Sequence, residues 1–489
     1  MYFLGVDLGT SAVKVLLVDK EGNILFVEKE EYPLHLFASN HSEQNPSDWL
    51  KGVFACIKRI TSKVDDVNKI KGISFAGQMH GLVVLDKNDE VIRPCILWND
   101  GRTDKETDYL NNVIGKKTLI DLTGNIAFAG FTLSKILWLK NNEPMNFKRI
   151  DKIMLPKDYL AYVFSNVFAT DYSDASGTLL LDVKNKVWSK QMCDIACIKE
   201  TQLPKLYESY EVIGVINKKL ANELNLPTDL KVIIGAGDNA ASAIGTGSIA
   251  NNDVTISLGT SGTIFISSDN FISSYDSVIH SFAHASGKYH LMGCILSASS
   301  CSKWWVENIL KSSFENENDD YDNLIANNSV IFLPYLMGER CPHNDTSAKG
   351  AFIGMRLNTT REEMHLAILE GITFALKDNL EIALKGGLNV KRAVLCGGGS
   401  KSKGMKQIVA NILNIEIDTL LSEQGPGYGA AILAMVGTNA YKDINTAVNK
   451  IVKISSTIKP IPSYVEHYKK KYQIFKKLYI DLKDTFKEW

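Results

Sequence analysis

Apolar residues dominate the first thirty positions of the chain and fall into three short runs. These runs cover residues 2–8, 13–18 and 24–30. The segment Asp-Lys-Glu-Gly at 19–22 separates the second and third runs and has the composition of a hairpin turn. The pattern therefore predicts that the chain begins with a three-stranded antiparallel meander.

Longer segments have the composition and spacing of helices. Residues 45–64 begin with Asn-Pro-Ser and place apolar side chains three or four positions apart, which is typical of an amphipathic helix. Residues 130–142 and about 360–385 are also predicted to be helical. In the Lys-rich tail from about 463, apolar positions repeat with helical spacing. We expect this last helix to dock through its apolar face and to leave a basic face in water.

Two polar loops flank a predicted hairpin in the first half. A short strand at 72–76 ends in the loop 77–81, the hairpin spans 82–97, and the loop 98–102 follows it. Because one hairpin joins the two loops, we expect their side chains to lie near each other.

The tetrapeptide Leu-Gly-Thr-Ser occurs twice, at 8–11 and at 258–261. Each copy lies between two β-type runs and opens about half of the chain. The residues at 245–253 are rich in turn formers, as expected between domains. We therefore predict a duplicated α/β fold with domains at 1–246 and 247–489.

The length and net charge of the chain argue against several classes of function. At 489 residues the chain is too long for one hydrophobic core. A net charge of −1 argues against a nucleic-acid or membrane-surface partner, because such partners usually require a basic face. The apolar runs are shorter than the ~20 residues of a membrane span, and no basic leader precedes the first strand. We expect a cytoplasmic protein.

Cysteine and histidine spacing gives little sign of a metal site. The eight cysteines are scattered and contain no Cys-x-x-Cys pair, so neither a disulfide nor a zinc site is expected. His280 and His284 are four positions apart and could ligate a metal from one helix. The segment around them also alternates like a strand, and both interpretations stay open.

The two Gly-Thr-Ser turns are candidate phosphate loops. Such a turn exposes successive backbone N–H groups and two hydroxyls, which can surround an anion. Asp7 precedes the first copy and Ser257 the second. One carboxylate could hold a Mg²⁺ ion that bridges phosphates, whereas a second would repel them. An ordinary β-turn is the alternative for each copy. The candidate phosphate contacts are Gly9, Thr10, Ser11, Lys14, Gly259 and Thr260.

A third glycine-rich segment, Gly-Gly-Gly-Ser at 397–400, lies inside a predicted strand-turn-helix at 393–413. Glycine lets a backbone approach a ligand, and a helix N-terminus offers free N–H groups to it. Gly398 and Gly399 are therefore candidates for nucleotide contacts. The segment matches neither the Walker A loop nor the dinucleotide fingerprint, so it does not by itself identify a nucleotide site.

Asp238 stands where a Gly-rich strand at 231–237 meets the start of a predicted helix. Its neighbours are small and leave room for a ligand. Aspartate is a good helix N-cap, and position alone favours that role. A general base is the chemical alternative, and an Asn substitution separates the two because Asn caps equally well but cannot take a proton.

The loops 77–81 and 98–102 combine hydrogen-bonding side chains with one indole. This mixture suits a sugar or polyol, whose hydroxyls need polar partners and whose carbon skeleton needs an apolar cover. Each residue could instead be structural, and only the clustering favours a ligand. The candidates are Gln78, His80, Trp98, Asn99 and Asp100.

Several segments, in order along the chain, resemble the FGGY carbohydrate kinase family. GVDLGTSAVKV is similar to its first phosphate loop, and GFTLSKILWLKNN and GAFIGMRLNTTREEMHLAILEG to its two signature segments. The branch that acts on xylulose is the most similar, through AGQMHGLVVLD, RPCILWNDGR, LPKDYL, GDNAASAIGTG, SLGTSGT and FLPYLMGERCPHND. The Met-His pair at 79–80 is the narrowest marker. The resemblance runs from the first strand to about residue 440.

The resemblance implies two actin-like, ribonuclease-H-type domains around a cleft. It also implies an enzyme that uses ATP and Mg²⁺ to convert D-xylulose to D-xylulose 5-phosphate, with Asp238 as the general base. Met79 and His80 would contact the sugar, and Asn239 next to the base is assigned to the sugar as well. Asp7 would lie near Mg²⁺ and the phosphates, and the nucleotide side would include Thr260, Gly398 and Gly399.

Two alternatives remain from the sequence alone. A kinase for another ketose or polyol would share the machinery but not the sugar pocket. An actin- or chaperone-like ATPase would hydrolyse ATP without sugar to drive partner binding. A homodimer would fit the resemblance, although no interface can be identified from the residues.

Overall fold

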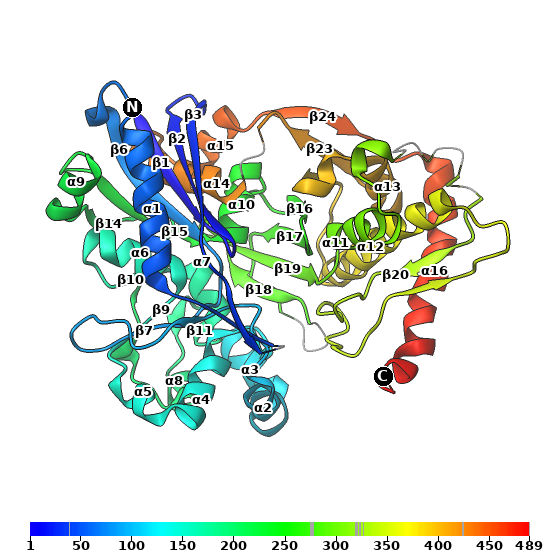
Figure 1. Ribbon diagram of the computed structural model, residues 1–489, viewed down its shortest axis with the longest axis horizontal. Coiled ribbons are helices and arrows are strands. Elements are labelled where there is room, and N and C mark those ends of the chain that lie inside the picture. The colour runs from blue at the N-terminus through cyan, green and yellow to red at the C-terminus, as the bar shows by residue number, and fades with distance from the viewer. Residues whose placement is uncertain are drawn as a thin grey trace.

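Two large mixed β-sheets, one in each half of the chain, organise the protein (Figure 1). The computed structural model describes residues 1–488 except 39, 274–277, 318–320, 322–323, 326 and 423–424. The first sheet consists, in spatial order, of β14 (Val212–Val215), β15 (Lys231–Gly237), β6 (Ile70–Gly77), β1 (Tyr2–Leu8), β2 (Ala12–Asp19) and β3 (Ile24–Glu31). The second consists of β18 (His280–Ala283), β19 (Tyr289–Ile295), β17 (Gly262–Ser268), β16 (Val254–Leu258), β22 (Arg392–Cys396), β23 (Glu416–Leu420) and β24 (Ile454–Ile458).

The two sheets share one topology. In the first, β1 pairs antiparallel with β2 and parallel with β6, which pairs parallel with β15. In the second, β16 pairs antiparallel with β17 and parallel with β22, which pairs parallel with β23. Each repeated Gly-Thr-Ser turn joins the first two strands of its sheet. The predicted meanders and the duplication are therefore confirmed, and β18 is an additional edge strand of the second sheet.

The predicted helices form close to their expected bounds. They are α1 (Pro46–Thr61), α4 (Thr132–Asn142), α10 (Asp238–Thr246), α12 (Arg361–Lys385), α13 (Lys403–Leu413) and α16 (Pro462–Phe486). Helix α16 buries Tyr468, Tyr472 and Phe475, whose rings lie 5.2–6.1 Å from that of Phe374 on α12. The predicted docking of the tail is thus confirmed.

One predicted element is different in the structure. Only isolated bridges join the two arms of the expected hairpin at 82–97. Strand β7 (Val83–Leu85) pairs instead with β9 (Lys152–Met154), and β8 (Cys95–Ile96) pairs with β5 (His41–Gln44). Both arms are buried, and Pro94 lacks the N–H that a regular ladder needs. Each arm therefore finds its partner elsewhere.

Helix α14 (Gly425–Gly437) comes from the second half but packs on β1 and β6 of the first sheet and along α10 (Figure 1). The approach is so close that a Cβ atom added at Gly5 would overlap the Gly427 carbonyl oxygen. One added at Gly429 would overlap the Ala241 carbonyl oxygen. The boundary expected near residue 246 stays a prediction, because the packing interleaves the two halves.

The remaining elements are short helices and short strands outside the two large sheets. The shorter helices are α2 (Asp104–Asp108), α3 (Lys116–Thr123), α5 (Pro144–Arg149), α6 (Pro156–Ser165), α7 (Tyr172–Ala175), α8 (Lys190–Ala196), α9 (Lys218–Leu224), α11 (Ser299–Lys303) and α15 (Ile444–Ile451). The remaining strands are β4 (His35–Ala38), β10 (Ala169–Asp171), β11 (Leu181–Asp182), β12 (Val187–Trp188), β13 (Lys205–Tyr207), β20 (Ile331–Leu333) and β21 (Ala351–Ile353). Within the described ranges, no helix has both the length and the apolar character to cross a membrane.

The helical interpretation of His280 and His284 is wrong, because His280 opens strand β18. Both imidazoles are buried among aromatic rings, and burial lowers the pKa of His284 to about 4. Among the described residues, no group of three or more His, Cys, Asp or Glu side chains is arranged to hold a metal ion.

The contact between α14 and α10 predicts that one methyl group added at the contact will clearly destabilise the fold. Gly429→Ala should lower the free energy of unfolding by about 1–3 kcal/mol, because the helices must separate to admit the Cβ atom. Thermal melting, with Gly214→Ala as the control, measures the effect. An added Cβ at Gly214 meets Val167 at an ordinary 3.5 Å. Equal melting temperatures for the two variants would contradict the packing argument.

Candidate active site

A polar cavity of about 450 Å³ lies between the two halves and contains residues from both. The first half contributes Lys14 from β2 and Asp238 and Asn239 from α10, and the second contributes Ser257 and Gly398. The structure therefore brings together the candidate base, one lysine and the third glycine segment. The other polar residues of its wall are Ser242, Thr246, Thr255, Thr263, Lys401 and Ser422.

Asp238 is placed by the junction of β15 and α10. Its carboxylate accepts hydrogen bonds from the backbone N–H of Asn239 (2.7 Å) and from the Asn239 side-chain amide (2.8 Å). The N-cap position belongs to Gly237, and Asp238 does not cap the helix. Burial raises the pKa of Asp238 to about 6, against the lowering effect of these hydrogen bonds. The carboxylate is thus held by its neighbour without serving as a cap.

Asp7 lies near Asp238, at the end of β1. Burial raises the pKa of Asp7 to about 7, and the negative charge of Asp238 adds to this increase. Lys14, opposite Asp7 on β2, lowers the pKa. Within the described part of the chain, no hydrogen-bond donor reaches the Asp7 carboxylate. Two carboxyl groups therefore share a site in which burial raises both pKa values and the charge of Asp238 further disfavours ionisation of Asp7.

The two Gly-Thr-Ser turns have related geometry but different surroundings. The Gly9 N–H donates to the Ala12 carbonyl (3.1 Å), and the Gly259 N–H donates to the Ser261 carbonyl (3.0 Å). The side chains of Ser11 and Thr260 are exposed. Both turns thus keep hydroxyls at the surface.

The hydroxyl of Thr10 is already engaged by the polar loops. It accepts a hydrogen bond from the Trp98 indole (3.0 Å) and donates to the Gln78 side chain (3.3 Å). Gln78 is buried and also donates to Gln44 (3.0 Å). The first turn is therefore physically linked to both loops that were predicted to bind a sugar.

Met79 and His80 are held against the strand that carries the base. A Cβ atom added at Gly237 would lie only 3.0 Å from the Met79 side chain. His80 adopts a left-handed backbone conformation with φ 68°. Its imidazole contacts the Gly177 carbonyl through Nδ1 (2.7 Å) and stacks on Phe131. Burial lowers the pKa of His80 to about 3, so this imidazole is neutral.

Asp100 and Asn99 are placed differently from the other loop residues. The Asp100 carboxylate accepts hydrogen bonds from the Arg102 guanidinium (2.7 and 2.8 Å) and from the Ser42 N–H (2.6 Å). It is buried, whereas Asn99 is exposed. Sugar contacts by these two residues stay predictions, and the bonds of Asp100 favour a structural role.

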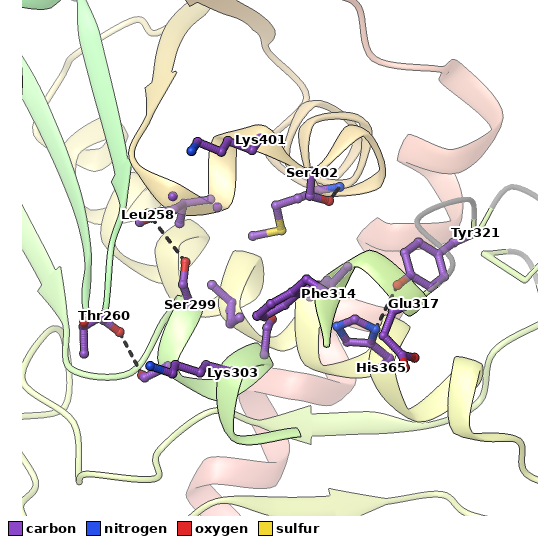
Figure 2. A pocket seen from close by; sticks show the side chains of 17 residues that line it. Leu258, Thr260, Ser299, Lys303, Phe314, Glu317, Tyr321, His365, Lys401 and Ser402 are labelled. Atoms are coloured by element: carbon purple, nitrogen blue, oxygen red, sulfur yellow. Dashed lines mark hydrogen bonds between the residues drawn. The ribbon is translucent and has the colours of Figure 1, made fainter. Parts of the chain in front are cut away.

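A second cavity, of about 610 Å³, adjoins the first and shares Gly398 and Lys401 with it (Figure 2). Thr260 and Gly399 also line it. At Gly398, an added Cβ atom would meet no atom within 4 Å, so the backbone there borders open space. Apolar side chains make up much of its wall, namely Leu258, Phe314, Leu369, Ile372 and Met405.

Polar groups lie around this apolar wall. Figure 2 shows Tyr321 and His365 together at one end, where the Tyr321 hydroxyl and His365 Nδ1 are 3.0 Å apart. Ser299 donates to the Leu258 carbonyl (3.2 Å) near the opposite side. The apolar wall of this cavity was not found in the sequence analysis. Apolar positions of α12 and α13 have the same pattern whether they face a core or a cavity.

Sequence reasoning also missed a buried ionic cluster behind the base. Lys157 is fully buried and pairs with Asp158 (2.6 Å) and Asp171 (2.9 Å). Asp171 in turn accepts a hydrogen bond from the Ser173 hydroxyl, which itself accepts one from the Gly237 N–H (3.2 Å). The cluster therefore fixes the backbone just before Asp238. The segment LPKDYL, which contains Lys157 and Asp158, is the part of the sequence that could have indicated it.

Comparison with known proteins assigns the family. The model of the FGGY family of carbohydrate kinases, N-terminal domain, matches residues 2–245, and that of its C-terminal domain matches residues 254–438. The chain belongs to the FGGY family of carbohydrate kinases. The predicted fold, two actin-like, ribonuclease-H-like α/β domains, is thereby confirmed. Family membership makes ATP the phosphoryl donor and excludes the partner-driven ATPase.

Individual relatives agree with this FGGY assignment over the whole chain. The xylulose kinase of Lactococcus lactis is 38% identical over 485 residues, covering 98% of this chain and 96% of the relative. The structure of a ligand-bound xylulose kinase from Lactobacillus acidophilus has a TM-score of 0.91 at 28% identity, covering 100% and 99%. That of a gluconate kinase from Lactobacillus acidophilus has a TM-score of 0.93 at 27% identity, with the same coverage.

The carboxyl pair of this FGGY kinase predicts a pH-dependent stability. Both groups bind protons more tightly in the folded chain than in the unfolded chain, where an aspartate has a pKa of about 4. Stability should therefore fall as pH rises from about 4 to 7. Asp7→Asn removes one of the two charges that destabilise the folded chain at high pH. The variant should therefore melt above the wild type at pH 8.

Thermal melting from pH 5 to pH 8 without metal or nucleotide measures this difference, which should shrink at lower pH. Asp443→Asn is the matched control, because Asp443 caps α15 and its pKa is lowered by the Thr446 side chain. A melting curve of Asp7→Asn that follows the wild type at every pH would contradict the prediction.

Proposed function

We propose that this FGGY kinase transfers the γ-phosphoryl group of ATP to the terminal hydroxyl of D-xylulose, giving D-xylulose 5-phosphate and ADP. The position of Asp238 carries the proposal. The base lies in a polar cavity that continues into an apolar one, and it is next to the loop that holds Met79 and His80. The names of the most similar relatives support xylulose as the sugar.

Asp238 would take the proton from the sugar hydroxyl. A pKa of about 6 keeps the carboxylate ionised at neutral pH while making it a better base than an ordinary aspartate. Lys14 lies in the same cavity and would offset negative charge on the phosphates. The apolar cavity would hold the nucleotide base, and the glycine-rich turn at 397–399 would lie along the phosphates.

The surroundings of Asp7 fit a magnesium ion. Mg²⁺ prefers oxygen ligands, usually one or two carboxylates together with phosphate oxygens and waters. Asp7 has no hydrogen-bond donor among the described residues, and burial together with the charge of Asp238 raises its pKa. A cation at Asp7 would offset the repulsion from the Asp238 charge and leave Asp238 free to act as the base. When bound, Mg²⁺ would supply charge neutralisation for the transferred group.

The cellular setting completes the proposal and rests on the resemblance and on composition. We place the kinase in the cytoplasm, acting on small molecules, and a homodimer would fit. All eight cysteines have free thiols, a state typical of reducing compartments.

A sugar panel tests the proposed reaction. ADP release with Mg-ATP should be fastest with D-xylulose and slow with D-ribulose, L-ribulose, L-xylulose, glycerol, gluconate or no sugar. Preference for another sugar would keep the mechanism and reassign the pocket. ADP release that no sugar stimulates would refute the function.

Substitution of the base tests the mechanism. Asp238→Asn should lower kcat by about 10²–10⁴-fold, because the amide cannot accept the proton. Its melting temperature should not fall, because Asp238 does not cap its helix. Asp443→Asn, which alters a helix cap outside the two cavities, serves as the control and should keep full activity. Near-normal turnover by Asp238→Asn would rule out the base role.

A further inference from the structure

Arg340 lies in a loop of the second half that strand β20 leads into. Hydrogen bonds donated by backbone N–H groups hold the loop in place at this point. Glu339 accepts hydrogen bonds through Oε1 from the Arg340 N–H (2.7 Å) and the Leu296 N–H (3.1 Å). The Cys341 N–H donates to the Cys294 carbonyl (3.1 Å). These bonds tie the residue to the end of β19 and leave its side chain free to extend.

The guanidinium of Arg340 reaches the sugar loops of the first half. Its central carbon lies 5.9 Å from the centroid of the Phe128 ring. A Cβ atom added at Gly130 would lie 3.4 Å from its Nη2 atom and would overlap the Trp98 carbonyl oxygen. Only glycine at 130 lets these segments come so close. The charge of Arg340 also acts on the His80 imidazole.

This guanidinium has no protein acceptor within the ranges that the structure covers. Neither a carboxylate nor a hydrogen-bonding oxygen of the described residues contacts it, although it carries five N–H donors. The neighbouring Glu339 carboxyl accepts hydrogen bonds from two backbone N–H groups, and the Arg340 charge acts on it only at a distance, lowering a pKa that burial raises to about 8. A partly buried cation without partners is costly, so an external acceptor would explain its retention.

Two nearby carbonyl groups already have a cationic partner. Lys135 is fully buried nearby and takes up the His80 carbonyl (2.8 Å) and the Gly130 carbonyl (2.7 Å). Arg340 lines neither the polar cavity around Asp238 nor the apolar cavity next to it. Its place outside both cavities and beside the His80 loop favours an oxygen-rich ligand lying against that loop over a phosphate of ATP.

We propose that Arg340 is a sugar-binding residue, whose guanidinium donates to two neighbouring oxygens of the open-chain ketose held by Met79 and His80. The inference rests on the proposed function and adds to it a contact from the opposite half of the chain. The planar fork of arginine suits two adjacent acceptors, which a lysine cannot span. Sugar binding would then draw together residues of both halves.

Steady-state kinetics of Arg340→Met test this role. Loss of charge-assisted hydrogen bonds should raise KM for the sugar about 10- to 100-fold, while KM for ATP changes less than about twofold. Arg340→Lys keeps the charge and should fall between the wild type and Arg340→Met. Arg356→Met is the matched control, because Arg356 is exposed and belongs to the same half, and it should behave as wild type.

Calorimetric titration with the sugar alone separates binding from folding. The wild type and Arg356→Met should bind D-xylulose, and Arg340→Met should bind it at least tenfold more weakly at an unchanged melting temperature. If Arg340→Met melts early, Arg340→Lys carries the test. Unchanged sugar affinity, or an equal loss of sugar and ATP affinity, would overturn the inference.

The wild-type sugar panel keeps this test distinct from that of the proposed function. If the wild type responds to no sugar, the proposed function fails whatever Arg340→Met does. If it prefers a sugar other than D-xylulose, the same titrations with that sugar decide the role of Arg340.

Discussion

The close packing of α14 against α10 and β1 determines where the chemistry can occur. A Cβ atom added at Gly427 would lie 3.3 Å from Cβ of Asp7, and one at Gly245 would lie 3.0 Å from the Gly425 carbonyl oxygen. The same helix thus touches the strand that ends near Asp7 and the helix that Asp238 begins. Small residues along α14 and α10 bring two carboxyl groups from distant parts of the first half into one site.

That proximity has an electrostatic consequence. Both aspartates hold protons more tightly than free ones, and the nearest cationic side chain, Lys14, only partly compensates. The folded chain thus stores unfavourable charge interactions where a base and a metal ligand would be needed. The buried Lys157 cluster fixes the backbone just before Asp238 through Ser173, and so holds the base at its place in the site.

Local patterns were enough to predict most of the scaffold. The meander at 2–30 and the junction at Asp238 were predictable because alternation, turn chemistry and a helix start act within a few residues. The hairpin at 82–97 failed because its arms pair with β5 and β9, which lie elsewhere in the sequence. Pairing between distant strands depends on the whole fold, and an apolar run does not name its partner.

The candidate site was likewise predictable only where local sequence patterns mark it. Turns and loops with several polar residues were found, whereas the apolar wall around Met405 was not, because a cavity face and a core face have the same pattern. Asp100 illustrates the converse. Its loop looks like a ligand site in the sequence, yet Arg102 and Ser42 occupy its carboxylate.

The residues proposed for the reaction and those proposed for sugar selection lie in different parts of the fold. Asp7, Asp238 and the glycine turns lie on strand ends and helix starts that the two sheets hold in place. The residues that we propose to face the sugar, including His80 and Arg340, lie on loops. A xylulose kinase and a gluconate kinase therefore superpose on this chain almost equally well, since the shared scaffold dominates the comparison. Sugar choice has to be argued from the loop side chains, not from likeness of fold.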